Sequence, residues 1–241
     1  MRTDTTTSDA STSLSSPSLS QHRAKAAELS RGISSDAIYS RIEWLIAEKG
    51  LGGRILDYGA GIGHLTRRLL ACQRFERVSA VDMRGAPGDL ASVVEWIEQD
   101  LNAPLPGCDN AFDVVVAAEV IEHLENPRLM MRDIFRILRP GGTAIVTTPN
   151  NESWRSLLAL LLRGHYVAFT DSCYPAHITA LVRKDFARIF QEAQFPAPEF
   201  YFTDEGGIPG KPVVSWQLVS FGLLRGLRFS DNLVAVAKKQ A

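Results

Sequence analysis

The sequence contains no apolar run long enough to cross a membrane as a helix, which takes about 18 residues or more. Its longest uninterrupted apolar run, residues 157–162, has six residues. Cysteine is scarce as well. Cys72, Cys108 and Cys173 lie far apart and form no C-x-x-C pair, so we expect three reduced thiols in a cytoplasmic protein.

The chain also lacks a surplus of basic charge. It has 26 Lys and Arg against 27 Asp and Glu, which gives a net charge of −1 and a pI near 6.5. A protein held on nucleic acid by phosphate attraction normally carries a basic surplus, so the composition argues against a nucleic-acid partner. The 45% of hydrophobic and 22% of charged residues are typical of a globular protein with a sizeable core.

The N-terminal segment is dominated by small polar residues. The first 20 residues include 12 Ser and Thr and lack the apolar core of a signal peptide. Such a stretch buries too little surface to offset its ordering entropy, so we expect a disordered tail at residues 1–30 and one domain at 31–241. Arg2 and the Ser/Thr content also fit an organelle transit peptide, against which Asp4 and Asp9 argue.

Short apolar runs alternate with helical stripes through the rest of the chain. Strands are expected at residues 54–57, 78–81, 93–97, 112–118, 143–148, 200–202 and 233–237. Apolar residues follow helical spacing at residues 38–46, 62–69, 130–138 and 186–193. This alternation predicts an α/β fold with a doubly wound, mostly parallel seven-stranded sheet and helices on both faces. Ligands of such sheets bind beyond the carboxyl ends of the strands.

A glycine-rich motif, DYGAGIG at residues 57–63, connects the first predicted strand to the next helix. Glycine lets a ligand approach the backbone closely, and a helix start presents free N–H groups. Asp82 follows nineteen residues after Gly63, at the end of the second strand, where a carboxylate can accept ribose hydroxyls. The dinucleotide fingerprint G-x-G-x-x-G/A fails here, because His64 and Thr66 occupy the positions where it needs a small residue.

The acid-first pattern D-x-G-x-G-x-G resembles the first motif of the class I S-adenosylmethionine-dependent methyltransferases. Further matching segments follow in order between about residues 40 and 195, including EVIEHL at 119–124 and RPGG at 139–142. The resemblance implies S-adenosyl-L-methionine as the cofactor. The residues that it implies for cofactor binding are Asp57, Gly59, Gly61, Gly63, Asp82, Met83, Asp100, Leu101 and Glu119.

The resemblance also implies individual roles for some of these residues. In the family, the position of Asp82 binds the ribose, and that of Met83 lies beside the adenine. The position of Asp100 often faces the adenine amino group, and that of Glu119 lies near the methionine end of the cofactor.

The E-x-x-E-H segment has three open interpretations. It is similar to the segment with which ubiquinone-pathway O-methyltransferases and small-RNA 2′-O-methyltransferases bind a divalent metal, so the candidate ligands are Glu119, Glu122, His123 and, further along, His177. Glu119 and Glu122 would lie one turn apart if this segment is helical. The same residues could instead serve loop architecture, or His123 or His177 could act catalytically by taking the proton of the acceptor.

Residues 150–180 form an insertion after the fifth predicted strand. In the family that the sequence resembles, this region covers the acceptor pocket. Ser153 is expected to cap a nearly apolar helix at 154–163. This helix either packs on the domain, walls a pocket for a lipophilic acceptor, or touches a membrane surface with Arg155 and Arg163 at the headgroups.

Residues 204–230 form a second cap segment, in which 213–224 predicts an amphipathic helix or a hairpin strand. Core packing is the first expectation for this stretch. Covering one side of the cofactor cleft or a partner surface is the other.

These observations predict an enzyme that transfers a methyl group from S-adenosylmethionine to a small or lipid-like acceptor. An oxygen nucleophile is favoured, because residues 117–120 read AAEV where amide and base N-methyltransferases carry an N/D-P-P-Y/F motif. One alternative is a methyltransferase-like domain that binds the cofactor and serves a partner protein, with peripheral membrane contact as a further option. Another is RNA 2′-O-methylation, which the charge balance disfavours. The acceptor and the oligomeric state stay open.

Overall fold

The structure, a computed structural model, describes residues 32–240, so the tail expected at residues 1–30 lies outside the described residues. The helices are α2 (Asp36–Glu48), α3 (His64–Ala71), η1 (Ile121–His123), α4 (Pro127–Ile137), α5 (Trp154–Arg163), η2 (Asp171–Cys173), α6 (Arg183–Glu192), α7 (Trp216–Val219) and η3 (Leu227–Phe229). The strands are β1 (Gly53–Tyr58), β2 (Phe75–Asp82), β3 (Glu95–Glu98), β4 (Phe112–Ala117), β5 (Leu138–Pro149), β6 (Glu199–Phe202), β7 (Gly207–Ile208), β8 (Lys211–Ser215) and β9 (Asn232–Lys238).

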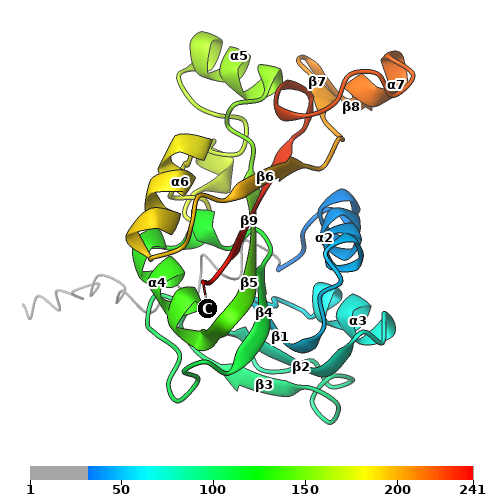
Figure 1. Ribbon diagram of the computed structural model, residues 1–241. Coiled ribbons are helices and arrows are strands. Elements are labelled where there is room, and N and C mark those ends of the chain that lie inside the picture. Colours follow the sequence, from blue (N-terminus) through cyan, green and yellow to red (C-terminus); the bar gives the residue numbers. More distant parts are fainter. Residues whose placement is uncertain (1–31, 241) are drawn as a thin grey trace, which may run out of the picture.

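Seven strands form one twisted sheet in the order β3-β2-β1-β4-β5-β9-β6. The first five strands of the chain pair in parallel, and β9 lies antiparallel between β5 and β6. Helices α2 and α3 cover one face of the sheet, and α4 and α6 cover the other (Figure 1). The prediction of a doubly wound, mostly parallel seven-stranded sheet is confirmed.

The central strand β4 explains why such a sheet needs continuous apolar runs. Val115 packs in the core cluster under α4 and α6, whereas Val114 and Val116 pack in the cluster under α2 and α3. Successive side chains of a strand point to opposite faces, so the part of a strand that helices cover on both faces, here residues 114–117, must be apolar.

Several element boundaries differ from the sequence predictions, and three of the differences involve residues predicted to lie inside an element. Ile62 precedes α3 and is partly exposed, because the left-handed backbone of Gly63 delays the helix start to His64. Leu138 begins β5 instead of ending α4. Val93 stands exposed in a turn ahead of β3, which begins at Glu95.

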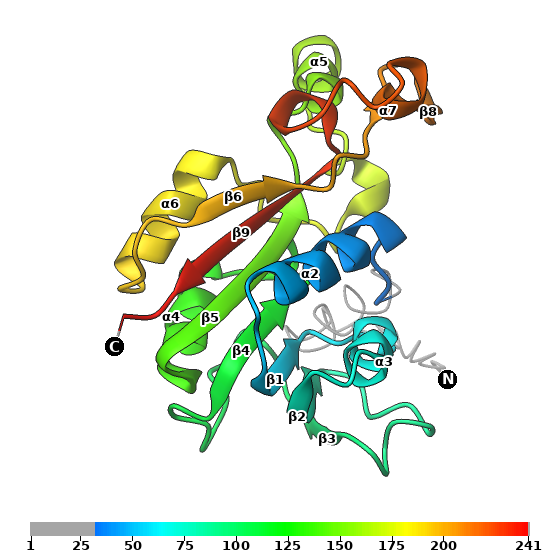
Figure 2. The same ribbon diagram turned by 45° about the vertical axis from the view of Figure 1, so that its right-hand side comes forward.

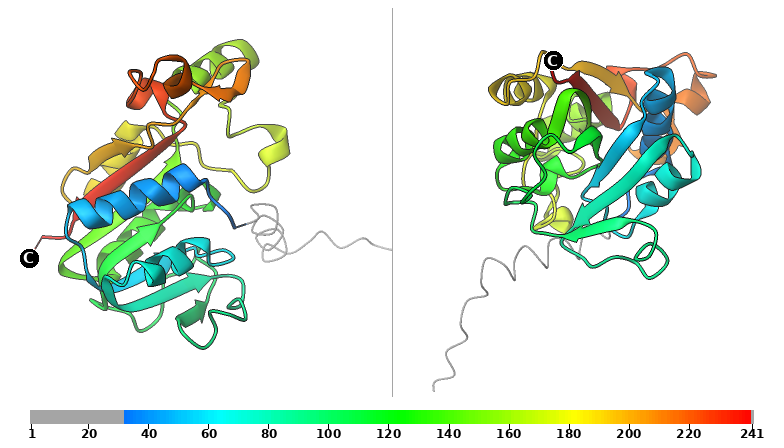
Figure 3. Two further views of the ribbon diagram at one scale, coloured as in Figure 1. Left: turned by 90° about the vertical axis from the view of Figure 1, so that its right-hand side faces the viewer. Right: turned by 60° about the horizontal axis from the view of Figure 1, so that its bottom comes forward.

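Helix α5 of the insertion after β5 and the segment between β6 and β9 lie at one end of the molecule, beyond the carboxyl end of β5 (Figure 2, and Figure 3, left). Helix α5 begins as predicted, with the Ser153 hydroxyl accepting a hydrogen bond from Ser156 N at 3.2 Å. Ser156 is the single buried residue of α5, so this helix contacts the rest of the domain along a narrow strip and leaves most of its apolar side chains exposed.

The 204–230 segment also departs from its first expectation. It forms the hairpin β7–β8 and the short helix α7, and Val213 and Phe221 are 95% and 96% exposed. Core packing is therefore wrong for this stretch. Both faces of the sheet already carry helices, which leaves no sheet face for these side chains to cover. Between residues 32 and 240, no helix has the length and apolar character needed to cross a membrane.

Candidate active site

The glycine loop between β1 and α3 lies at the carboxyl edge of the sheet. Gly59 N and Ala60 N both donate to the carbonyl oxygen of Val81, at 2.8 and 3.0 Å, which ties the loop to the end of β2. A Cβ added at Gly61 would stand 2.6 Å from Gly32 Cα, so the N-terminal segment can approach only a glycine at this position. The loop thus holds two backbone segments together at the mouth of a cavity.

A cavity of about 900 Å³ opens beside this loop. Eight of the nine predicted cofactor residues line it, together with both predicted catalytic histidines: Asp57, Gly59, Gly61, Asp82, Met83, Asp100, Leu101, Glu119, His123 and His177. Gly63 is not among the lining residues. Its left-handed backbone starts α3, and a Cβ there would collide with the Leu90 side chain.

Asp82 is held by two backbone donors. Gly61 N donates to Asp82 Oδ2 at 2.8 Å, and Arg84 N donates to Oδ1 at 2.9 Å. Each carboxylate oxygen can accept more than one hydrogen bond, so both keep capacity for hydroxyl donors in the cavity. The side chain is therefore fixed in orientation before any ligand binds.

Asp57 plays a different part from Asp82. Its side chain is buried and accepts a hydrogen bond from Thr66 Oγ1 of α3 at 2.6 Å. Burial, with a smaller contribution from the Asp82 carboxylate, raises the pKa of Asp57 to about 7. Asp57 thus links the end of β1 to α3 at the floor of the cavity.

Asp100 sits in a tight turn after β3. Its Oδ1 accepts hydrogen bonds from Asn102 N at 2.9 Å and from Asn102 Nδ2 at 3.0 Å. This turn holds Asp100 and the neighbouring Leu101 at the rim of the cavity.

Glu119 follows β4 in a left-handed backbone conformation, with φ of 56°. Thr147 Oγ1 donates to its Oε1 at 3.0 Å, and Asn232 Nδ2 donates to its Oε2 at 3.1 Å. Burial, followed by repulsion from Glu122, raises the pKa of Glu119 well above its usual value. The condition for a one-turn spacing of Glu119 and Glu122 is not met, because residue 119 has a left-handed backbone and the 3-10 helix η1 starts only at Ile121.

Three of the four candidate metal ligands converge. One ligand atom each of Glu122, His123 and His177 lies within 4.8 Å of the others, and Glu119 is not part of this group. Glu122 is fully buried, and its Oε2 accepts a hydrogen bond from Thr148 Oγ1 at 3.2 Å. Its Oε1 has no hydrogen-bond partner among the described residues, and burial raises the pKa of this carboxyl.

The two histidines of the group have matching hydrogen bonds. His123 Nδ1 contacts the carbonyl oxygen of Ala176 at 2.7 Å, and His177 Nδ1 contacts that of Ala168 at 2.6 Å. A carbonyl can only accept, so each Nδ1 carries the hydrogen and each Nε2 keeps its lone pair. The rings meet edge to face, with centroids 4.8 Å apart. Burial lowers the pKa of both histidines, and for His177 the neighbouring His123 lowers it further.

The backbone of η1 and of the residue after it also holds the segment after η2 in place by hydrogen bonds. The backbone oxygen of Glu122 accepts hydrogen bonds from Ile178 N and Thr179 N, at 2.9 and 3.0 Å. Thr179 Oγ1 donates to the carbonyl oxygen of Leu124 at 2.8 Å. These contacts explain how His177, 54 positions after His123, reaches the same cavity wall.

The cavity is also lined by residues that the sequence did not predict, among them Tyr39, Tyr174, Asn232 and the segment 32–35. Asn232 begins β9, and its place beside Glu119 depends on the antiparallel register of that strand with β5, which has no local sequence signal.

Residues 30–197, more than half of the chain, match the family described as methyltransferase domain. The chain belongs to this family. The prediction of a class I methyltransferase domain with S-adenosylmethionine as its cofactor is thereby confirmed.

Curated relatives of this methyltransferase domain include ubiquinone biosynthesis O-methyltransferases from two Pseudomonas species. That of Pseudomonas fluorescens Pf-5 is 31% identical over 130 residues, and that of Pseudomonas aeruginosa UCBPP-PA14 is 29% identical over 133 residues. Each match covers 50% of this chain and 55% of the relative, so the chain spans about half the length of the curated relatives it matches.

Solved structures share the fold at low sequence identity. A possible histamine N-methyltransferase from Thermotoga maritima has a TM-score of 0.61 at 15% identity, covering 90% of this chain and 92% of that one. The 1,6-didemethyltoxoflavin-N1-methyltransferase of Burkholderia thailandensis, solved with S-adenosylhomocysteine, has a TM-score of 0.58 at 19% identity, covering 94% and 93%. At this identity the likeness establishes the fold alone.

Proposed function

We propose that this protein transfers the methyl group of S-adenosylmethionine to a hydroxyl oxygen of a small or lipid-like acceptor. The observation that carries the proposal is the Asp82 carboxylate, anchored by Gly61 N at 2.8 Å, in the same cavity as two neutral histidines. The first group suits the ribose of a nucleoside cofactor, and the second suits an acceptor that must lose a proton. The curated O-methyltransferase relatives support oxygen as the nucleophile.

The cofactor would lie along the carboxyl ends of β1, β2 and β4. In this arrangement Asp82 accepts the ribose hydroxyls, Met83 flanks the adenine and Asp100 faces the adenine amino group. Glu119 lies at the other side of the loop, where its carboxylate would meet the ammonium group of the methionine part. Gly59 and Gly61 let the cofactor approach the backbone.

The reaction needs alignment and one proton acceptor. The acceptor oxygen attacks the methyl carbon in line with the S–CH₃ bond, the C–S bond breaks, and its electron pair stays on sulfur as S-adenosylhomocysteine forms. The hydroxyl proton passes to Nε2 of His123 or His177, each of which keeps a lone pair because its Nδ1 is bound to a carbonyl.

The donor set around these histidines also fits a divalent metal ion. Two imidazole nitrogens and a buried carboxylate oxygen without a partner, from His123, His177 and Glu122, match the ligands of first-row metals. Both histidines donate their other ring N–H to a carbonyl, as metal-bound histidines commonly do. A metal held there would lower the pKa of the acceptor hydroxyl. Glu119, held by Thr147 and Asn232, is left out of this set.

Calorimetric titration with S-adenosylhomocysteine tests the cofactor site. Wild-type protein should bind with micromolar affinity, and Asp82→Ala should lower the affinity at least about 100-fold, because two charge-assisted hydrogen bonds of about 1.5–3 kcal/mol each disappear. No binding by the wild type would favour the alternative of a domain that serves a partner protein. Once binding is established, phenols, sugars and lipids can be screened as acceptors.

Metal analysis of the purified protein tests whether Glu122, His123 and His177 bind a metal ion. Stoichiometric retention of Mn²⁺ or Zn²⁺ that Glu122→Gln abolishes would support metal-assisted transfer. Full methylation activity in excess chelator would end this part of the proposal and leave the histidines as proton acceptors.

We further infer that residues 31–241 act as one domain, with 150–180 and 204–230 as cap segments. Residue 232, which begins β9, lines the cavity, so the C-terminal part of the chain contributes to the same site as the glycine loop. The cytoplasmic location stays a prediction from the cysteine content.

A further inference from the structure

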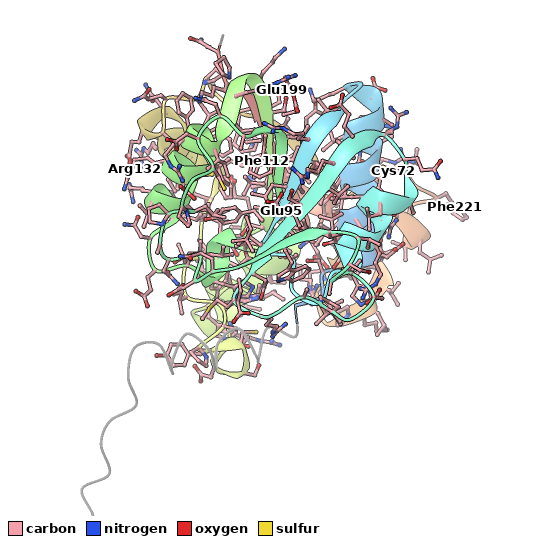
Figure 4. The ribbon with its side chains drawn as sticks, turned by 90° about the horizontal axis from the view of Figure 1, so that it is seen from below. Cys72, Glu95, Phe112, Arg132, Glu199 and Phe221 are labelled. Atoms are coloured by element: carbon pink, nitrogen blue, oxygen red, sulfur yellow. The ribbon has the colours of Figure 1, made fainter. Side chains whose placement is uncertain are left out.

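Two segments at one end of the molecule expose large apolar side chains. In α5, Leu161 and Leu162 are 80% and 71% exposed. In the segment from β8 to the turn after α7, the exposed group comprises Val213, Leu218, Phe221 and Leu223. Figure 4 places Phe221 at the outer margin of the molecule, pointing away from it. We call residues 154–163 and 211–225 together the apolar end.

The two segments are tied to each other. Asp231 Oδ2 accepts a hydrogen bond from Arg155 of α5 at 2.7 Å and another from Gly207 N of β7 at 3.0 Å. The guanidinium of Arg228 lies 5.3 Å from the ring centre of Trp154. These contacts hold α5 beside η3 and the base of the β7–β8 hairpin, and Figures 1 and 2 show both parts of the apolar end beyond the same edge of the sheet.

The charge of this surface has one sign, in contrast to the whole chain. Residues 154–163 and 211–225 contain four Arg and Lys and no Asp or Glu, whereas the chain has a net charge of −1. Arg163, Lys211 and Arg225 are exposed and have no ion pair with a described residue. Arg155, expected at a headgroup, instead pairs with Asp231.

Two of the nearby acids are paired within the fold. Glu152, at the start of the α5 segment, pairs with Arg183, and Asp204, ahead of β7, pairs with Arg41 at 2.7 Å. Glu205, next to β7, is exposed and has no ion pair with a described residue, so a single acidic side chain faces the three unpaired basic residues of the apolar end.

We propose that the apolar end binds the surface of a bilayer that contains anionic phospholipids. Exposed leucine and phenylalanine side chains bordered by Arg and Lys are the combination that partitions into the interface between headgroups and acyl chains. A second copy of the chain fits less well, because pairing this surface with itself would bring like charges together.

The position of the apolar end links it to the cavity. Asp231, which accepts hydrogen bonds from α5 and from β7, directly precedes Asn232, which lines the cavity. Docking on a bilayer would hold the acceptor side of the cavity near the lipid, which suits a lipid-like acceptor; this consequence, unlike the binding itself, rests on the proposed function.

Vesicle co-sedimentation of the full chain, without methyl donor, tests the proposal. The vesicles are pure phosphatidylcholine, or phosphatidylcholine with one quarter phosphatidylglycerol. The wild type should sediment with the anionic vesicles, and Phe221→Asp with Leu223→Asp should lower the partition coefficient at least about tenfold. Val93→Asp, an exposed apolar residue ahead of β3 at the far edge of the sheet, is the matched control and should bind like the wild type.

Charge reversal tests the electrostatic part separately. Lys211→Glu with Arg225→Glu should weaken binding to anionic vesicles by more than about 20-fold, since each basic residue near such a surface contributes about fivefold. With vesicles of pure phosphatidylcholine, the partition coefficients of the wild type and this variant should differ less than with anionic vesicles.

Three results would overturn the proposal: no sedimentation of the wild type with anionic vesicles, equal sedimentation of the Phe221/Leu223 variant, or a wild-type dimer that this variant converts to monomer without any lipid binding. Thermal unfolding and S-adenosylhomocysteine binding are recorded for each variant. If the wild type binds vesicles but does not bind S-adenosylhomocysteine, the proposed function is contradicted and the membrane proposal is still supported.

Discussion

The side-chain amide of Asn232 donates a hydrogen bond to Glu119 at 3.1 Å across 113 positions of the sequence. The register of β9 against β5 pairs Asn232 with Pro149, which brings Asn232 to the carboxyl end of the sheet. Thr147 Oγ1 holds the other carboxylate oxygen at 3.0 Å. Donors from β5 and β9 thus orient a carboxylate that follows β4.

Replacing Asn232 by Ala should weaken S-adenosylhomocysteine binding about three- to tenfold, because one hydrogen bond of about 0.5–1.5 kcal/mol no longer orients Glu119. Thr147→Val should have an effect at least as large, since Thr147 Oγ1 also accepts from Glu119 N at 2.9 Å. Calorimetry gives the affinities, with thermal unfolding as the control for folding. Unchanged affinity in both variants would remove Glu119 from the cofactor site.

Gly61 and Gly50 form a matched pair for testing the glycine loop. Their φ angles are nearly equal, 58° and 60°, but an added Cβ would meet the Gly32 backbone at Gly61 and nothing within 4 Å at Gly50. Ala at either position should lower the free energy of unfolding by about 1–2 kcal/mol through the left-handed backbone. Only Gly61→Ala should also weaken S-adenosylhomocysteine binding, by about tenfold, because it displaces residues 32–35 from the cavity. Equal affinities in the two variants would argue against a binding role for the loop.

The methylation rate should depend on pH through His123 and His177. The pKa of each lies below 6.5, so both are neutral at pH 7, and the rate should be level there and fall only as the pH drops further. Removing the histidine that accepts the proton should cost about 10²–10⁴-fold in rate. His123→Gln and His177→Gln are therefore compared by rate–pH profiles, with His165→Gln, outside the cavity lining, as the control. Full rates in both variants would exclude proton acceptance by either.

Asp57 should make the cofactor-free protein less stable as the pH rises from about 4 to 7. Its pKa is about 7 in the fold and about 3.9 in an unfolded chain, so over this range the unfolded state alone releases the proton. The loss amounts to at most about 4 kcal/mol, at 1.36 kcal/mol per pKa unit. Asp57→Asn should reduce the difference between the free energies of unfolding measured with urea at pH 5 and at pH 7.5. An equal difference in variant and wild type would show that Asp57 ionises normally.

Much of the fold and of the cofactor site could be predicted from local patterns. The apolar run at 112–118 is required by a strand covered on both faces, and it became β4. The glycine motif and Asp82 lie where a parallel sheet brings its strand ends together, so eight of nine predicted cofactor residues reached one cavity. Gly63 did not, because a motif position does not reveal whether its backbone faces the ligand or, as here, the Leu90 side chain.

The sequence by itself determined the alternation of strands and helices, the glycine loop and the acids at strand ends, because these depend on the spacing of neighbouring residues. Tertiary structure alone decided three features. Hydrogen bonds from Thr147 and Asn232, which come from distant strands, hold Glu119 outside the group of Glu122, His123 and His177. Antiparallel register brings Asn232 to Glu119. Helix α5 and residues 211–225 are exposed because other helices already cover both faces of the sheet. This coverage is a property of the assembled layers, so the spacing of neighbouring residues does not reveal it.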